Sequence, residues 1–210
     1  MTSRPASVLV LSPLLVALSL GVPVHAAEWS GGGAQTRSAA ARPTWDTLAH
    51  SRWIADGRAD APRQVYVFLD ANCVYCAKFW ADARPWVDSG KVQLRYLLVA
   101  VIAPSSVGKA ATLLADPDPA TRLAAYERSH AFGVARMMQG GPRHSMDDAS
   151  LATMPTIPEA VRRTLLANQD LMDALGLQGT PGLVFPGPDG RLAALGGLPA
   201  SGLDRVLGPR

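Results

Sequence analysis

Hydrophobic and polar positions along the chain predict a mixture of strands and helices. Residues 64–69 (Gln-Val-Tyr-Val-Phe-Leu) are rich in β-branched and aromatic side chains and too few for a helix, so we expect a buried strand. Residues 92–102 begin with alternating positions and end in a continuous apolar run, as in a strand that enters the centre of a sheet. Residues 178–185 lead into a third strand, and residues 190–195 form its hairpin partner.

Helical patterns occupy most of the remaining chain. One helix is predicted over residues 44–56 with Thr44 as its N-cap, and another over residues 76–84, where Pro85 marks a kink or a stop. Further helices are predicted over residues 106–114, 119–130, 157–175 and 200–207. This order of elements predicts an α/β fold, an open sheet with helices on both faces and an inserted helical subdomain at about 105–175.

The first residues have the pattern of an export signal. Arg4 precedes an apolar stretch over residues 8–22, and small residues follow at the cleavage positions, so residues 1–26 are predicted to be a signal peptide. We expect the mature chain to be released beyond the inner membrane, with a flexible leader at 27–43 and one globular domain at 44–210. The 20 Lys and Arg and 17 Asp and Glu form no charge run, so neither nucleic acid nor anionic lipid is an expected partner.

The chain has only two cysteines, Cys73 and Cys76, and they lie where the first strand gives way to a helix. At a helix N-terminus the unpaired backbone N–H groups and the positive end of the dipole favour a thiolate and lower the pKa of a thiol. The first cysteine is then placed to attack a disulfide, and the second, one turn inside the helix, is placed to resolve the mixed disulfide. The motif therefore predicts redox chemistry.

Three other interpretations of the cysteine pair compete with redox chemistry, and the residues set two of them, zinc and haem, aside. A permanent structural disulfide is typical of an exported protein, but so short a loop constrains the unfolded chain very little. A zinc site needs two more ligands, and the histidines of the mature chain, His50, His130 and His144, lack finger-like spacing. Haem attachment needs a histidine directly after the second cysteine, where this chain has Ala77. The redox interpretation is favoured, without a metal or a cofactor.

Several segments around and beyond the cysteine pair match a known pattern. They are residues 66–68 with Asp70, the Cys73 to Cys76 motif, residues 78–80, residues 83–95, residues 171–173, Thr180-Pro181 and residues 197–199. In these segments the chain resembles the DsbC/DsbG family of periplasmic thiol:disulfide interchange proteins, within the thioredoxin superfamily. The resemblance covers about Trp45 to Leu207 and implies a thioredoxin-like fold with a helical insertion.

The resemblance also implies roles for individual residues. Cys73 is expected as the nucleophile and Cys76 as the resolving thiol. Thr180-Pro181 is expected as a cis-proline loop that faces them, where an extended substrate peptide adds as a strand. Val74 stands where the family usually has proline or glycine, and Tyr75 either contacts substrate or covers the disulfide.

Acidic residues near the cysteines bear on proton transfer. Asp70 lies three residues before the nucleophile, where it either modulates the thiols and shuttles a proton or caps the turn. Thioredoxin places a buried acid six residues before its first cysteine, whereas this chain has Val67 there. That proton-relay route is therefore not expected.

The expected function is thiol:disulfide exchange in exported proteins. The Cys73 thiolate attacks a disulfide or a sulfenic acid, and Cys76 resolves the product. The resemblance implies re-reduction by a DsbD-like membrane electron donor. Family members have a separate N-terminal dimerisation domain, whereas only a short leader precedes Thr44 here, so we expect a monomer. In a monomer, reduction of substrate disulfides is favoured over their isomerisation. A disulfide-donating oxidase and a chaperone-like holdase with secondary thiol chemistry are the alternatives, because one fold serves all three.

Overall fold

The computed structural model describes residues 43–199 and 202–210. The predicted signal peptide at 1–26 and the predicted leader, apart from its last residue, lie outside these residues. Within the described part, no helix is both long enough and apolar enough to cross a lipid bilayer.

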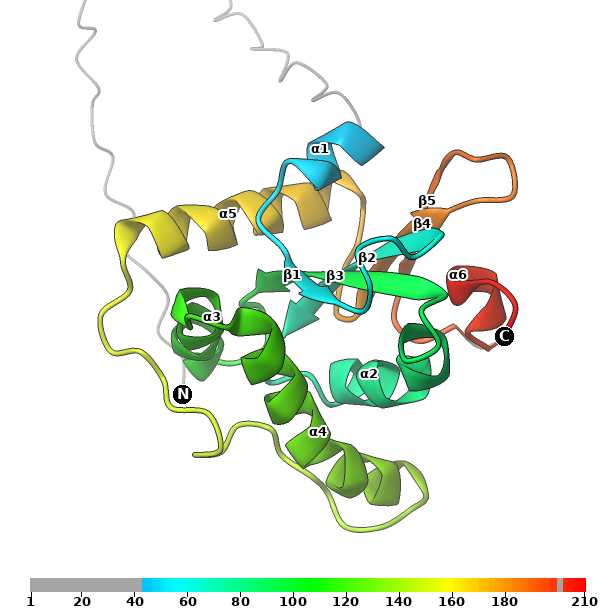
Figure 1. Ribbon diagram of the computed structural model, residues 1–210. Coiled ribbons are helices and arrows are strands. Elements are labelled where there is room, and N and C mark those ends of the chain that lie inside the picture. The colour runs from blue at the N-terminus through cyan, green and yellow to red at the C-terminus, as the bar shows by residue number, and fades with distance from the viewer. Residues whose placement is uncertain (1–42, 200–201) are drawn as a thin grey trace, which may run out of the picture. The chain divides into compact units, whose positions relative to one another are not determined.

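A five-stranded sheet forms the centre of the described domain (Figure 1). Its strand order is β1-β3-β2-β4-β5, with bounds Ile54–Asp56 (β1), Arg63–Asp70 (β2), Val92–Val99 (β3), Gly182–Pro186 (β4) and Leu192–Gly196 (β5). β2 and β3 run parallel, and the other neighbouring pairs are antiparallel. The predicted buried strand and the predicted hairpin are confirmed. Because β2 and β3 end at the same edge of the sheet, the loops that follow them lie together there.

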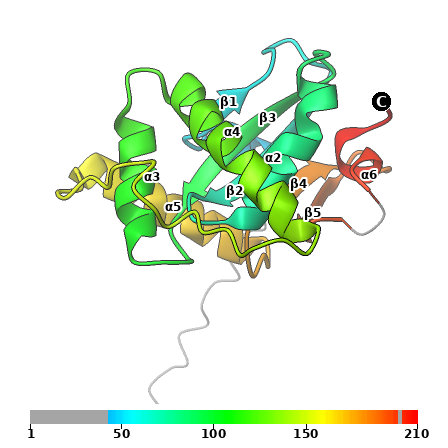
Figure 2. The same cartoon turned by 90° about the horizontal axis from the view of Figure 1, so that it is seen from below.

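Side chains of the sheet alternate between two hydrophobic clusters. From β2, Val65, Val67 and Leu69 belong to one cluster, whereas Tyr66 and Phe68 belong to the other. Helices cover both faces, and their bounds are Trp45–Ala49 (α1), Val74–Val87 (α2), Ser105–Ala115 (α3), Pro119–Met138 (α4), Glu159–Ala174 (α5) and Asp204–Leu207 (α6). In Figures 1 and 2, α2 and α4 lie on one side of the sheet, and α1 and α5 on the other. The predicted α/β layering is therefore confirmed.

The three helices between β3 and β4 are divided between the two faces of the sheet. α4 crosses over α2 (Figure 2), α3 contacts α4, and α5 packs against β3 from the opposite side. α4 continues to Met138, whereas the sequence predicted an end at His130. It continues because Val134 is fully buried one turn later, and because Gly133 leaves room for the His144 ring: an added Cβ would lie 2.3 Å from His144 Nδ1.

The prediction of a helix over residues 44–56 is wrong in its second half. Thr44 caps α1 as predicted, because its Oγ1 accepts a hydrogen bond from the N–H of Thr47 at 3.2 Å. The helix ends at Ala49, and Ile54–Asp56 forms β1, which pairs antiparallel with β3. Asp56 also binds the guanidinium of Arg84 at 2.5 and 3.0 Å. Pairing with a distant strand thus overrides the local pattern.

Pro85 does not stop α2, which continues to Val87. The proline removes one backbone donor, but the next residues are well anchored. The Trp86 side chain is 2% exposed and its Nε1–H donates to the Gly208 carbonyl at 2.8 Å. Burial of this last turn accounts for the longer helix. At the other end of the chain, α6 begins at Asp204, and residues 200–201 of the predicted helix lie outside the described residues.

Candidate active site

Cys73 lies at the start of α2, directly after the turn that leaves β2. It is the N-cap residue, with backbone angles of φ −90° and ψ 103°, and its Sγ accepts a hydrogen bond from the N–H of Cys76 at 3.2 Å. Unpaired backbone N–H groups and the positive end of the helix dipole stabilise negative charge at this position. The local structure therefore favours the ionised form of this thiol.

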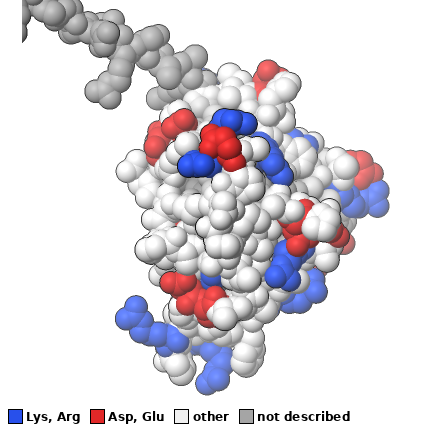
Figure 3. Space-filling view, turned by 90° about the vertical axis from the view of Figure 1, so that its left-hand side faces the viewer, with Lys and Arg blue, Asp and Glu red and all other residues white. Residues whose placement is uncertain are grey.

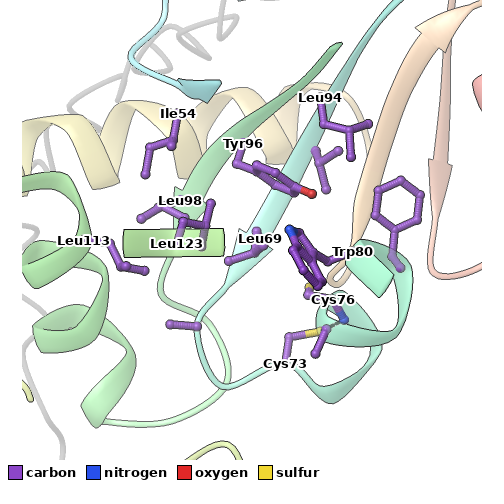
Figure 4. Packing of buried hydrophobic residues seen from close by; sticks show 14 of the residues in the cluster. Ile54, Leu69, Cys73, Cys76, Trp80, Leu94, Tyr96, Leu98, Leu113 and Leu123 are labelled. Atoms are coloured by element: carbon purple, nitrogen blue, oxygen red, sulfur yellow. Dashed lines mark hydrogen bonds between the residues drawn. The ribbon is translucent and has the colours of Figure 1, made fainter. Parts of the chain in front are cut away.

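The two thiols occupy different environments, although both are free and lie together at the start of α2 (Figure 4). A hydrogen bond from the Cys76 side chain lowers the pKa of Cys73 below its ordinary value, against an opposing effect of burial. The backbone N–H groups of Tyr75 and Cys76 act in the same direction. Burial, and then the neighbouring Cys73, raise the pKa of the fully buried Cys76 well above its ordinary value. Of the two thiols, Cys73 therefore loses its proton more readily and Cys76 holds its proton more tightly.

The loop before β4 brings Thr180 and Pro181 against the dithiol. The Thr180–Pro181 peptide bond is cis, and the Thr180 carbonyl oxygen lies 3.3 Å from Cys73 Sγ. The Pro181 carbonyl accepts a hydrogen bond from the N–H of Gly197 at 2.8 Å, which ties the loop to the end of β5. Two segments that are far apart in the sequence therefore meet at one site.

Asp70 holds the turn in front of the dithiol. Its fully buried carboxylate accepts hydrogen bonds from the N–H of Asn72 (2.8 Å), Ser106 Oγ (2.7 Å), the N–H of Val101 (2.6 Å) and the N–H of Ile102 (2.9 Å). β3 ends at Val99, rather than at Ile102 as predicted, because these last two N–H groups donate to Asp70 and not to a neighbouring strand. With both oxygens occupied in this way, the geometry favours the capping role of Asp70 over a proton shuttle.

Val74 and Tyr75 lie on the outer side of the dithiol turn. Tyr75 is 52% exposed, and Ile102, in the loop that follows β3, is 51% exposed. A pocket of about 280 Å³ opens beside Val74 and is lined by Asn72, Val74, Ile102, Ala103 and residues 143–147. The left-hand side of Figure 1, seen face-on in Figure 3, has small separate groups of acidic and basic side chains around a broad uncharged area. The exposed Tyr75 and Ile102 side chains offer apolar surface beside this pocket, which suits contact with a polypeptide.

A buried polar network connects α3 and α4 to the turn that precedes Cys73. Lys109, only 1% exposed, donates from Nζ to Tyr126 Oη at 3.3 Å and to the Met146 carbonyl. Tyr126 Oη in turn lies 2.6 Å from the carbonyl oxygen of Ala71. These contacts fix the helices that follow β3 relative to the dithiol. Residues 43–199 and 202–210 contain no cluster of three or more His, Cys, Asp or Glu that could hold a metal ion.

Glu127, on α4, is a buried acid near the dithiol that the sequence analysis did not identify. Burial, and then the charge of Cys73, raise its pKa well above the ordinary value, and Glu127 in turn contributes to the raised pKa of Cys76. The helical pattern of the sequence does indicate that Glu127 is buried. Glu127 lies four residues after Leu123 in the predicted helix over residues 119–130, which places it on the apolar stripe.

Comparison with known proteins gives two sequence relatives and a structural likeness, and no protein-family model matches the chain. The "Thiol:disulfide interchange protein DsbG" of Pseudomonas aeruginosa is 42% identical over 171 residues, which are 81% of this chain and 60% of the relative. The protein of the same name from Escherichia coli K12 is 42% identical over 160 residues, 76% of this chain and 58% of the relative. The chain thus spans about three fifths of the length of these relatives.

Among solved structures, a periplasmic thioredoxin-like protein from Salmonella enterica serovar Typhimurium superposes with a TM-score of 0.53. The two sequences are 19% identical, and the match covers 74% of this chain and 87% of that one. At this identity the likeness concerns the fold alone. The fold of the described domain is thioredoxin-like.

Proposed function

Because this chain is a relative of the DsbG thiol:disulfide interchange proteins, we propose that it is a thiol:disulfide oxidoreductase. It reduces or isomerises disulfides, or reduces sulfenic acids, in exported proteins. The observation that carries the proposal is the asymmetry of the dithiol: Cys73 is an N-cap thiol with a lowered pKa, and Cys76 is a buried thiol with a raised pKa. An ionised nucleophile beside a protonated second thiol is the starting state that disulfide reduction requires.

The reaction has two exchange steps. The Cys73 thiolate forms a bond with one sulfur of the substrate disulfide, and the other substrate sulfur leaves as a thiolate. Cys76 then attacks Cys73 Sγ, and the bond between Cys73 and the substrate breaks. The substrate leaves reduced by two electrons, and the Cys73 to Cys76 pair is oxidised.

Substrate contacts are assigned to the groups around Cys73. The backbone of Thr180 and Pro181 lies beside the nucleophile, where an extended peptide adds by main-chain hydrogen bonds. Val74, Tyr75 and Ile102 form an apolar rim at the same end of the sheet. A polypeptide with an accessible disulfide fits both features.

The proposal includes the compartment and the electron donor. The periplasm is the expected site of action, and a DsbD-like membrane protein is the expected source of electrons. We expect a monomer, which light scattering during size-exclusion chromatography would test. A dimer in that experiment would make isomerisation, rather than plain reduction, the activity to examine first.

Insulin reduction is the direct test of the activity. Wild-type protein supplied with a dithiol should precipitate the insulin B chain, Cys73→Ser should fall to the background of the dithiol alone, and Cys76→Ser should accumulate a covalent complex with insulin. Equal activity of wild type and Cys73→Ser would overturn the proposal. A Cys73→Ser, Cys76→Ser double variant that still suppresses aggregation of a cysteine-free client would instead indicate a holdase.

The direction of exchange is tested in cells. Acid quenching followed by a mass-shifting thiol label reports the redox state of Cys73 and Cys76. Mostly reduced protein supports a reductase or isomerase that receives electrons from a donor. Mostly oxidised protein would contradict this and indicate a disulfide-donating oxidase.

A further inference from the structure

The exposed side of α4 carries basic side chains around one aromatic ring. Arg128, Phe132 and Arg136 are spaced four residues apart, so they line one side of the helix, and the exposed Arg122 extends this side toward the helix start. Phe132 is 75% exposed, more than any other large apolar side chain in the described part of the chain. The Arg136 guanidinium lies 6.0 Å from the centre of its ring. These four residues are called the basic face of α4 below.

The arginines of the basic face have no acidic partners. Among residues 43–199 and 202–210, none of the three forms an ion pair, whereas on α5 both Arg162 and Arg163 pair with Glu159. The acids of the loop that follows α4, Asp147 and Asp148, accept hydrogen bonds from serine hydroxyl groups instead. Like charges on one helix face repel each other. A partner that carries carboxylates would relieve this repulsion.

The basic face is produced by the helix and not by a charge run. Its arginines are spread over residues 122–136, and only the period of the helix brings them to one side. In Figure 3, basic side chains gather at the lower end of the molecule, where Figure 1 places α4 and the loop that follows it. The absence of a charge run in the sequence is therefore compatible with a local basic surface.

The basic face comes close to the dithiol at two points. α4 packs across α2 (Figure 2), and the Arg128 guanidinium lies 5.8 Å from the centre of the Trp80 ring, which is one turn after Cys76. Beyond the end of α4, the exposed Arg143 lines the pocket beside Val74. A polypeptide that lies along this face therefore extends to the neighbourhood of the nucleophile.

We propose that the basic face of α4 binds an acidic segment of the polypeptide whose disulfide is exchanged, with an apolar side chain of that segment on Phe132. The inference rests on the proposed disulfide exchange, and the substrates it implies are exported polypeptides with carboxylates near the reactive disulfide. A guanidinium group binds a carboxylate through two parallel hydrogen bonds. The exposed ring supplies the apolar contact that orients the segment.

A polypeptide fits this face better than a lipid surface does. An interfacial helix lays a broad apolar face into the lipid. The apolar stripe of α4, which includes Leu123, Tyr126 and Val134, is instead buried in the core of the described domain. Phe132 is the one large apolar side chain of α4 that the described structure leaves exposed. One ring among arginines suits a short segment with acidic and apolar residues.

The test compares three peptides that share one internal disulfide and differ in a flanking tail of Glu, Gln or Lys residues. Reduced full-length protein is mixed with each peptide, quenched in acid at set times and analysed by mass spectrometry. Below saturation and at about 20 mM salt, wild type should reduce the Glu-tailed peptide about tenfold faster than the Gln-tailed one, and the Lys-tailed one most slowly. These differences should disappear at about 500 mM salt, because exposed charges are then screened.

Matched variants locate the effect. Arg128→Gln combined with Arg136→Gln should abolish the preference for the Glu-tailed peptide. Arg162→Gln combined with Arg163→Gln removes the same charge from α5, on the opposite side of the sheet, and should keep the wild-type preference. Loss of the preference in both double variants would overturn the inference, because net charge would then be responsible. Equal slowing of all three peptides in the α4 variant, with the preference kept, would also overturn it.

The role of Phe132 is tested with a second peptide pair. For wild type, a Glu-tailed peptide with one leucine in the tail should react about threefold faster than the same peptide with serine there. Phe132→Ser should abolish this advantage, and Phe132→Leu should retain most of it. A leucine advantage that survives in Phe132→Ser would show that the ring is not the apolar contact.

The two proposals fail in different ways. If wild-type protein reduces none of the peptides, the proposed function is wrong. If wild type reduces all three at equal rates in low salt, the function stands and the binding role of the basic face is wrong. Flotation with anionic phosphatidylglycerol vesicles covers the remaining case. Vesicle binding that Arg128→Gln with Arg136→Gln abolishes, together with equal peptide rates, would overturn the inference in favour of a membrane surface.

Discussion

The two faces of the sheet differ in how completely their buried polar groups are hydrogen-bonded. On the side of α1 and α5, Tyr66 and Phe68 pack in a cluster whose polar groups are satisfied: Asn168 Nδ2 donates to the Leu98 carbonyl at 2.9 Å, and Arg95 donates to Tyr66 Oη at 2.6 Å. On the side of α2 and α4, a larger apolar cluster contains both thiols, and Glu127 and Trp80 have buried polar atoms without partners in the described residues. The face covered by α1 and α5 is packed for stability. The face covered by α2 and α4 leaves buried polar atoms without hydrogen bonds next to the reactive thiols.

The largest effect on stability is expected on the α5 side. Phe68→Ala removes a fully buried ring and should lower the free energy of unfolding by about 3–5 kcal/mol, because a cavity remains. Urea unfolding of the reduced protein measures this loss. The resolution rate under native conditions should stay at the wild-type value. A loss below about 1 kcal/mol would mean that this face is not the stabilising one.

Asp70→Asn should lower the free energy of unfolding by about 3 kcal/mol. The reason is that an amide NH₂ group replaces an oxygen that accepts hydrogen bonds from two donors. Urea unfolding measures the change, with Asp170→Asn on the exposed side of α5 as the matched control. Titration of Cys73 by its alkylation rate should show little change. A large shift of that titration at unchanged stability would instead support a role of Asp70 in modulating the thiols.

Glu127 should make stability fall as pH rises. Burial raises its pKa in the folded protein above the unfolded value near ~4.3, so between these two values the folded state binds more protons than the unfolded state. Relative to Glu127→Gln, wild type should therefore lose about 1.4 kcal/mol per pH unit across this window. Urea unfolding of both proteins from pH 4 upward measures the difference. A constant difference would show that Glu127 ionises normally.

The smallest effect is expected at Val74. It is the first residue of α2, where the N–H has no partner within the helix and the fixed φ of proline suits the first turn. Val74→Pro should raise the free energy of unfolding by about 0.4–1 kcal/mol, mainly by restricting the unfolded chain. Thermal unfolding of the reduced protein measures the gain. Destabilisation would indicate that the backbone at this turn is incompatible with proline.

Errors of the sequence analysis lie where distant contacts decide the local structure. Residues 54–56 have helix-compatible neighbours but pair with β3, and β3 ends early because Asp70 takes the N–H groups of Val101 and Ile102. Val67 correctly indicated that the strand holds no buried acid six residues before Cys73. An acid reaches the dithiol from α4 instead, as Glu127, and neither motif spacing nor the resemblance pointed to it.

The sequence by itself determined the features that depend on neighbouring residues. Alternation in β2, the capping of α1 by Thr44 and the position of Cys73 at the start of α2 follow from side-chain period and helix-end chemistry, which act within a few residues. Only the tertiary structure decided which distant groups meet at the thiols. Thr180 reaches Cys73 through the packing of β4 on β2, and Glu127 through the packing of α4 on α2, because such contacts depend on how whole elements bury their apolar faces.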